Sequence, residues 1–147
     1  MLRISKLADY GVVVMCYLVN QNGAVKSARE IAAAVHISVE TASKVLKLLS
    51  ECDLVSALRG AGGGYCLTRA PADISLSDVI QAVEGGMLAL TECASIDNNC
   101  AVDAACTLKH NWRLINRVLL SILNELTLHD MAQPLMLGVD GKLKCVK

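Results

Sequence analysis

The sequence predicts a mainly α-helical fold: a winged helix-turn-helix domain with a small β-hairpin wing, followed by a long C-terminal dimerisation helix. Three observations indicate this class. Two short helical segments that begin with capping residues flank a tight turn near residue 36. A glycine-rich hairpin pattern follows them directly. Towards the C-terminus, apolar residues repeat with a seven-residue period.

The composition limits the kinds of protein that this chain can be. The 147 residues include no Phe and one Trp, so we expect a core of Leu, Val, Ile and Ala. Residues 1–70 carry eight Lys or Arg against five Asp or Glu, and the remainder carries six against nine. A mildly basic N-terminal half is compatible with nucleic acid binding. The longest apolar run, 11–19, is too short for a bilayer and no signal peptide is visible, so we expect a cytoplasmic protein that does not bind membranes.

Two helices are predicted before the tight turn. Residues 5–20 have the broad apolar face of a first helix. Ser27 and Glu30 have the spacing of a capping box, in which each side chain bonds the backbone N–H of the other residue. This box predicts a second helix from residue 28 to about residue 35.

A third helix is predicted from Ser38, a good N-cap, to near Cys52. Its apolar positions fall on one side, which leaves a polar and basic outer face. A second short helix with such a face is typical of the recognition helix of a helix-turn-helix domain, which enters the major groove of double-stranded DNA. The candidate DNA contacts on this helix are Ser38, Glu40, Thr41, Ser43, Lys44 and Lys47.

Residues 54–68 are predicted to form a β-hairpin, because two short alternating segments flank the glycine-rich turn 60–64. A hairpin in this position is a wing. Arg59 lies at its tip, where it could enter a minor groove, and we include Gly62 and Gly63 among the candidate DNA contacts. A phosphate-binding loop is not expected, since no Lys-Ser/Thr pair follows the glycines and no helix begins there.

The chain is expected to divide into five segments. A second capping-box pattern at residues 75–78 predicts a connecting helix that ends at the glycine pair 85–86. The last residues have no periodicity, so we expect a loosely ordered tail. The segments are a winged domain at 1–70, a connecting helix at 71–91, a cysteine loop at 92–106, a dimerisation helix at 107–129 and the tail at 130–147.

Six apolar residues repeat at spacings of four and three along the long helix predicted over 107–128. Such a seven-residue seam is typical of packing against another helix. The seam could also pack against the chain's own N-terminal domain. Its length and its distance from the winged domain favour a homodimer, because DNA readers of this kind usually bind two half-sites. The seam residues are Leu108, Trp112, Ile115, Leu119, Ile122 and Leu126.

Three of the seven cysteines, Cys93, Cys100 and Cys106, lie in one short acidic loop. An odd cysteine count in a cytoplasmic protein argues for thiols or metal ligands over disulfides. Thiolates favour zinc, copper(I) or an iron–sulfur cluster. Zinc ligands usually include a pair two to four residues apart, and the longer gaps here favour a cluster. The cysteines on apolar segments are expected to be core residues: Cys16, Cys52 and Cys66.

These motifs together resemble a bacterial family of winged-helix regulators that sense iron–sulfur clusters. The matching parts are residues 2–11, the wing at 59–65, the helix at 76–84 and the three loop cysteines. The resemblance implies a dimeric repressor whose DNA affinity depends on a 2Fe–2S or 4Fe–4S cluster. The family includes regulators of iron–sulfur assembly operons and a nitric-oxide-sensing repressor. The opening segment is most similar to regulators of the SUF assembly system.

The resemblance implies two alternatives for a fourth ligand. In the assembly-operon branch a histidine follows the third cysteine after two residues, whereas here three residues separate Cys106 from His110. The extra residue places His110 about 100° further round a helix. In the nitric-oxide-sensing branch a carboxylate comes from the first helix of the partner subunit, and Asp9 matches that position. We therefore favour Asp9 over His110.

Several functions are compatible with these features. The first is a cluster-dependent repressor of SUF-type genes, with a nitric-oxide-sensing or redox-sensing repressor of the same family as its close alternative. A redox or electron-transfer protein would use the same cluster, but would leave the wing and the recognition helix without a purpose. A zinc-stabilised DNA-binding protein would need only a different metal. No nucleophile–base pair is visible, so an enzyme is not expected.

Overall fold

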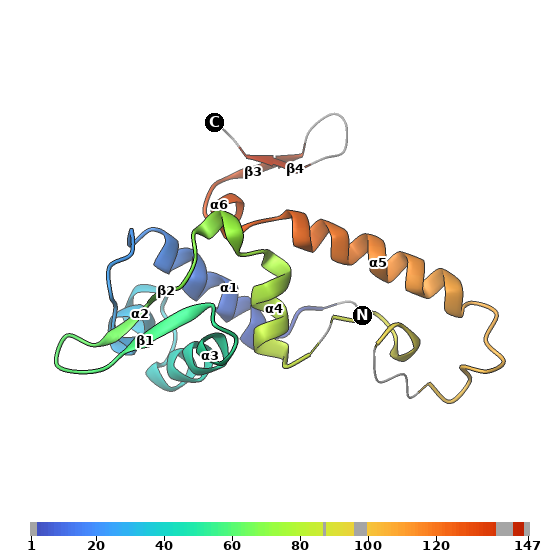
Figure 1. Ribbon diagram of the computed structural model, residues 1–147, viewed down its shortest axis with the longest axis horizontal. Helices are drawn as coiled ribbons and strands as arrows, with labels where there is room; N and C mark the ends of the chain where they lie inside the picture. The colour runs from blue at the N-terminus through green and yellow to red at the C-terminus, as the bar shows by residue number, and fades with distance from the viewer. Residues whose placement is uncertain (1–2, 87, 96–99, 138–142, 146–147) are drawn as a thin grey trace.

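The computed structural model describes residues 3–86, 88–95, 100–137 and 143–145 of the chain. Figure 1 shows the first four helices and the first hairpin gathered together, with one long helix extending away from them. The helices are α1 (Lys6–Val19), α2 (Ala28–Ala34), α3 (Val39–Glu51), α4 (Leu76–Glu84), α5 (Lys109–Glu125) and α6 (Leu128–Met131). The strands are β1 (Val55–Leu58), β2 (Gly64–Leu67), β3 (Leu135–Leu137) and β4 (Leu143–Cys145), and the short 3-10 helices are η1 (Pro71–Asp73) and η2 (Glu92–Ala94).

The predicted helix-turn-helix is confirmed, together with its capping residues. The Ser27 side chain accepts from the backbone N–H of Glu30 at 3.3 Å, and the Glu30 carboxylate accepts from the backbone N–H of Ser27 at 2.8 Å. His36 adopts a φ of 56° in the turn before α3. This left-handed backbone conformation turns the chain, so that α2 and α3 pack against each other.

The core lies between α1, α3 and α4. Gly11 allows the close approach of α1 and α4, because a Cβ built there would stand 2.8 Å from Cγ2 of Val83. The aliphatic core predicted from the sequence is confirmed, and its largest fully buried side chains are Leu, Ile, Val and Met. They are Met15, Ile31, Leu46, Leu49, Leu54, Ile74, Ile80, Leu128, Val14, Val45, Val55 and Val79.

The wing is a two-stranded antiparallel hairpin, as predicted. β1 pairs with β2 from Val55 opposite Leu67 to Leu58 opposite Gly64. The base of the wing is attached to the segment before α2, where Tyr65 and Lys26 exchange backbone hydrogen bonds of 2.8 and 3.0 Å. This attachment fixes the direction of the wing relative to the recognition helix.

The predicted long helix over 107–129 is wrong at its C-terminal end. α5 ends at Glu125, and Thr127 forms a capping box with Asp130 that begins the separate helix α6. The cause is a pairing distant in sequence. Leu126 is extended, its carbonyl accepts from the backbone N–H of Leu76 at 2.7 Å, and the N–H of Leu128 donates to the carbonyl of Ile74 at 2.9 Å. These bonds replace the next turn of helix and tie the end of α5 to the start of α4.

The expectation of a loosely ordered tail is wrong for its described residues. β3 and β4 form a second antiparallel hairpin, with Leu135 opposite Cys145 and Leu137 opposite Leu143. Three-residue strands are too short to give a readable alternation in the sequence. Within the described part of the chain, no helix is long and apolar enough to cross a membrane.

Candidate DNA interface and cysteine loop

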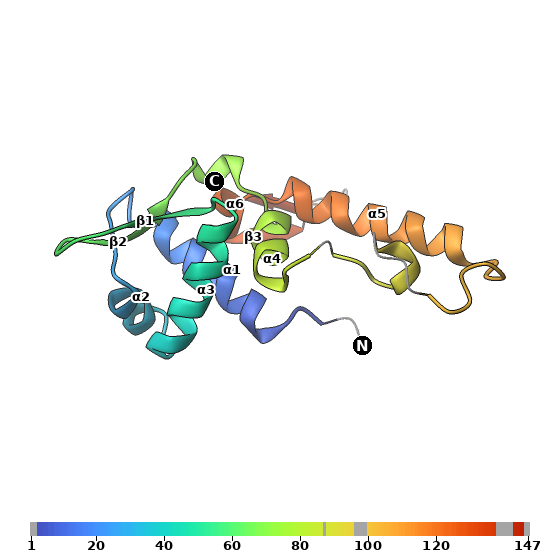
Figure 2. The same ribbon diagram turned by 60° about the horizontal axis from the view of Figure 1, so that its bottom comes forward.

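The outer face of α3 and the tip of the wing are both open to solvent. Ser43, Lys44 and Lys47 are exposed on α3, and Arg59 is exposed where the wing turns. Figure 2 shows α3 and the β1–β2 wing at the same end of the molecule, away from α5. A helix and a neighbouring wing in this arrangement suit a major groove and an adjacent minor groove.

The first turn of α3 uses several candidate DNA contacts for its own capping. The Ser38 hydroxyl accepts from the backbone N–H of Thr41 at 3.1 Å and lies 3.0 Å from the Thr41 hydroxyl. The pKa of Glu40 is lowered, because its own backbone N–H and then the Ser38 hydroxyl hydrogen-bond its carboxylate. A charged carboxylate here repels phosphate. Its chemistry suits acceptance of a hydrogen bond from the exposed amino group of a cytosine.

The candidate contacts on α3 and the wing differ in the interactions and steric constraints that they have within the chain. Lys47 lies 3.9 Å from the carboxylate of Glu51 one turn later, in an exposed pair that contributes little to stability. A Cβ at Gly63 would collide with the carbonyl of Leu58, whereas nothing lies within 4 Å of a Cβ at Gly62. Gly63 is therefore required by the turn itself, and only Gly62 is free of that constraint.

The structure places the three loop cysteines in different environments. Cys93 lies in η2 and is buried, with its sulfur 3.2 Å from the Thr91 hydroxyl. Cys100 and Cys106 are half-buried. Across the described residues, no group of three or more His, Cys, Asp and Glu side chains is placed to hold a metal ion. As a donor set, three soft sulfur atoms in one loop fit an iron–sulfur cluster.

The cysteine loop is attached to α5 at several points that sequence reasoning missed. Arg113 donates from Nε to the carbonyl of Cys93 at 2.9 Å, and Lys109 forms an ion pair with Asp103. The Asn116 side chain, only 5% exposed, accepts from the backbone N–H of Leu90 at 2.9 Å. An asparagine amid the apolar residues of a long helix was the available signal. α5 therefore holds both halves of the segment that carries the cysteines.

The two candidates for a fourth ligand lie on different helices. Asp9 is exposed in the first turn of α1, and His110 is exposed in the first turn of α5. Neither joins the loop cysteines in a ligand group within the described chain. Exposure leaves Asp9 accessible to a partner subunit. The choice between the two residues stays a prediction.

The remaining described cysteines only partly follow the sequence expectation. Cys16 and Cys66 are half-buried, and burial raises the pKa of the Cys16 thiol, which keeps it protonated. Cys52 is exposed, so its assignment to the core is wrong. It occupies the C-cap of α3, one residue beyond the last helical turn that faces the core.

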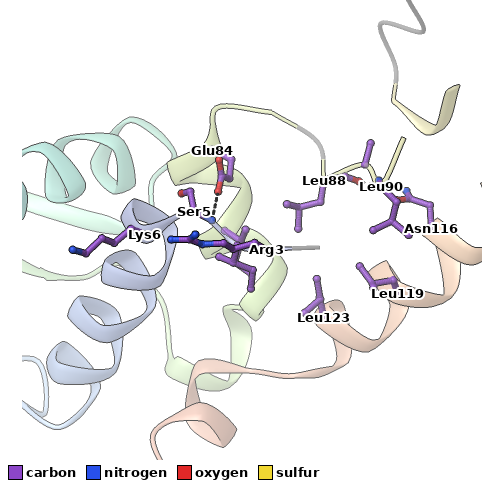
Figure 3. A pocket seen from close by; sticks show the side chains of 12 residues that line it. Arg3, Ser5, Lys6, Glu84, Leu88, Leu90, Asn116, Leu119 and Leu123 are labelled. Carbon is purple, nitrogen blue, oxygen red and sulfur yellow. Dashed lines mark hydrogen bonds between the residues drawn. The ribbon is translucent and has the colours of Figure 1, made fainter. Parts of the chain in front are cut away.

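The predicted seam of α5 is shared between two surfaces. Of the seam, Leu119 lines a groove of about 670 Å³ together with Leu88, Leu90 and Leu123, which lies outside the seam (Figure 3), and Leu126 packs against the core. The other seam residues stay open, and Leu114 and Val118 extend their surface. The open stripe consists of Leu108 (56% exposed), Trp112 (38%), Leu114 (42%), Ile115 (50%), Val118 (61%) and Ile122 (48%).

Comparison with known proteins assigns the winged domain, α5 and the linker, which is the segment between the end of α4 at Glu84 and the start of α5 at Lys109, to one family. Residues 4–134 match the family Rrf2, described as an iron-dependent transcriptional regulator. The chain belongs to the Rrf2 family. Its winged helix and its role as a DNA-binding transcriptional regulator follow from that membership. The resemblance inferred from the motifs is thereby confirmed.

Individual Rrf2 proteins match over nearly the whole chain. The HTH-type transcriptional regulator NsrR of Bacillus subtilis is 28% identical over 134 residues, covering 90% of this chain and 91% of that protein. NsrR of Bacillus licheniformis is 30% identical and covers 88% of this chain and 92% of its own. Among solved structures, CymR, the global cysteine regulator of B. subtilis, has a TM-score of 0.68 at 27% identity, covering 90% of this chain and 97% of that one. T. potens IscR has a TM-score of 0.67 at 30% identity, covering 88% and 85%.

Proposed function

We propose that this Rrf2 protein is a cytoplasmic homodimeric repressor of SUF-type iron–sulfur assembly genes, and that its DNA affinity depends on a 2Fe–2S or 4Fe–4S cluster. Cys93, Cys100 and Cys106 hold the cluster, with Asp9 of the partner subunit or His110 as the fourth ligand. A bound cluster supplies iron that reacts with oxygen and nitric oxide. Recognition of DNA falls to the outer face of α3 and to Arg59.

The observation that carries the proposal is the position of the three thiols. They lie in the segment that leads from α4 to α5. That segment connects the DNA-reading domain with the helix that carries the exposed apolar stripe. Two half-sites must be met at a fixed spacing, so a change in this segment that turns the domains relative to each other lowers specific affinity. The family's description as iron-dependent and the SUF-like opening segment support the same function.

A second candidate is a regulator without a cluster, in which the loop cysteines act as thiols or hold zinc. One observation favours free thiols: the described residues do not gather the cysteines into a metal-binding group. A nitric-oxide-sensing or redox-sensing repressor remains the alternative within the cluster-dependent reading.

Anaerobic purification followed by iron, sulfide and zinc analysis tests the proposal. We expect visible absorbance with equal amounts of iron and sulfide in the parent, and loss of both in Cys100→Ala. Cys16→Ala is the matched control, because that thiol is kept protonated on α1, and it should retain the cluster. Zinc without sulfide, or full iron and sulfide in Cys100→Ala, would contradict the proposed ligands.

Operator binding by the loaded and the cluster-free parent completes the test. A SUF-type promoter fragment should show a large difference between the two forms, and a random fragment of equal length should show none. Equal affinity of both forms for the promoter would reject cluster dependence while leaving DNA binding intact. Exposure of the loaded form to nitric oxide or oxygen then shows which signal lowers the affinity.

A further inference from the structure

One face of α5 carries polar side chains that hydrogen-bond the backbone of the linker. Asn116 and Arg113 lie three positions apart, so they project from the same side of the helix. Figure 3 shows Asn116 beside Leu90, on the side of α5 that faces the groove. The open apolar stripe lies next to this side of the helix: Trp112, one turn before Asn116, marks the border between them, and Leu114 lies farthest from Asn116. α5 thus contacts the linker with one face and offers the adjoining face to a partner.

The Asn116 amide satisfies backbone groups of a segment without regular secondary structure. Its oxygen accepts from the N–H of Leu90 at 2.9 Å, and its nitrogen donates to the carbonyl of Leu88 at 3.4 Å. Asn116 is 5% exposed, so water does not readily replace these bonds. Backbone groups in such a segment need partners, and a side chain on a rigid helix supplies them here.

Arg113 continues this contact to the first cysteine. Its Nε donates to the carbonyl of Cys93 at 2.9 Å, three residues beyond Leu90. Since Cys93 is buried, its backbone position also sets where its sulfur lies. We call the three hydrogen bonds from Asn116 and Arg113 to residues 88–93 the linker latch.

The latch attaches the linker to the first half of α5, and backbone hydrogen bonds attach the C-terminal end of α5 to the start of α4. At the far end of α5, the backbone bonds between Leu126 and Leu76 and between Leu128 and Ile74 join it to the start of α4. At the near end, the latch joins α5 to the chain that leaves α4. A displacement of Cys93 is therefore passed to α5 instead of being absorbed by a free linker.

We propose that Asn116 and Arg113 are positioning residues that set the first thiolate and couple occupancy of the cysteine loop to the orientation of α5. This inference rests on the proposed function, because it takes Cys93 as a cluster ligand. Coupling of this kind requires that the loaded and cluster-free forms differ in the segment to which the latch is attached. Loss of the latch leaves the cysteine ligands in the chain but weakens the coupling between the cysteine loop and α5.

The test compares Asn116→Leu with Asn124→Leu. The first substitution keeps the number and branching of the side-chain heavy atoms and removes both hydrogen bonds, and the second makes the same change at an exposed position of α5. In the cluster-free protein, we expect the Leu90 amide to exchange its hydrogen about fivefold faster in Asn116→Leu, the factor for loss of one hydrogen bond. Asn124→Leu should exchange at the parental rate.

The second readout is the ratio of operator affinities between the loaded and cluster-free forms. A general loss of stability lowers both affinities together, whereas loss of coupling reduces the ratio. We expect a ratio several times smaller in Asn116→Leu and in Arg113→Ala than in the parent, and an unchanged ratio in Asn124→Leu. Arg113→Lys, which cannot reproduce the Nε donor, should resemble Arg113→Ala.

The outcomes separate this inference from the proposed function. A parent that loads a cluster and responds to it, with an unchanged affinity ratio in Asn116→Leu, would overturn the latch alone. Parental exchange at the Leu90 amide in Asn116→Leu would overturn it as well. A parent that never loads iron and sulfide would overturn the proposed function and this coupling together.

Discussion

The open apolar stripe of α5 predicts that Ile115→Glu disrupts a homodimer. Ile115 is 50% exposed in the single chain, and its neighbours Val118 and Ile122 on the stripe are 61% and 48% exposed. An apolar stripe of this length on a monomeric protein would be unusual. A second copy of α5 is the partner that the seven-residue seam predicts.

The expected loss of dimer stability follows from the exposed fraction of the Ile115 side chain. Full burial of an isoleucine side chain contributes about 1.5–3 kcal/mol, so covering the exposed half of Ile115 contributes about 1 kcal/mol. A two-fold symmetric dimer contains the residue twice, which gives about 2 kcal/mol, or a roughly thirtyfold weaker dimer when the apolar contact alone is lost. Two glutamates brought together in the interface add a desolvation and repulsion cost, so thirtyfold is the lower bound.

Sedimentation equilibrium measures the dissociation constant directly, and Trp112 supplies an optical reading. It is the only tryptophan of the chain and lies 38% exposed, three positions before Ile115. Covering its ring on dimerisation should shift its emission to shorter wavelength as protein concentration rises. In Ile115→Glu this shift should require at least about thirtyfold more protein.

Asn124→Glu is the matched control, since it places the same charge at an exposed position away from the stripe. It should dimerise like the parent. An unchanged dissociation constant in Ile115→Glu would show that Ile115 does not lie in a dimer interface. So would a monomeric parent at every concentration tested. Charges at Leu119 are a poorer test, because that side chain faces the chain's own groove and its replacement perturbs the subunit itself.

Three further predictions concern other parts of the molecule. Arg59→Ala should lose about 1–3 kcal/mol at the specific operator in a titration and much less on random DNA; equal losses would make it a backbone contact. Asp9→Ala should change the absorbance of the loaded protein, or its rate of cluster loss under oxygen, more than His110→Ala does; the reverse order would assign the fourth ligand to the histidine. Gly11→Ala should lower the free energy of unfolding by about 1–3 kcal/mol in urea titrations, because its Cβ would lie 2.8 Å from Val83. A rise in stability would show that α4 moves aside and that helix propensity dominates.

The beginnings of α2, α3 and α4 were predictable because their causes are local. The capping residues Ser27, Ser38 and Ser75 each bond a backbone N–H three positions later. Such contacts depend on spacing alone, so they can be read from the sequence. The end of α5 depends on a distant pairing, because the bond that stops it joins Leu126 to Leu76; the capping box of Thr127 and Asp130 just after it was a local signal that was missed.

The exposure of the candidate DNA contacts on α3 was predictable for the same reason. An amphipathic helix that buries its apolar positions must expose the residues between them, which places Ser43 and Lys44 outside. The structure adds which other candidate contacts on α3 already have partners within the chain. Ser38 and Thr41 bond each other, and Lys47 has a carboxylate one turn away.

The helices and the hairpin of the winged domain, the apolar seam of α5 and the three thiols in one loop could be inferred from the sequence, because they depend on local spacing. Which seam residues the subunit covers depends on tertiary packing, since periodicity gives the direction of a side chain about the helix axis but not the position of its neighbours. Leu119 faces the groove and Leu126 packs against the core, whereas Ile115 stays open. The attachment of the loop is also tertiary, because Asn116 and Leu90 lie 26 residues apart and meet only when α5 folds back along the linker.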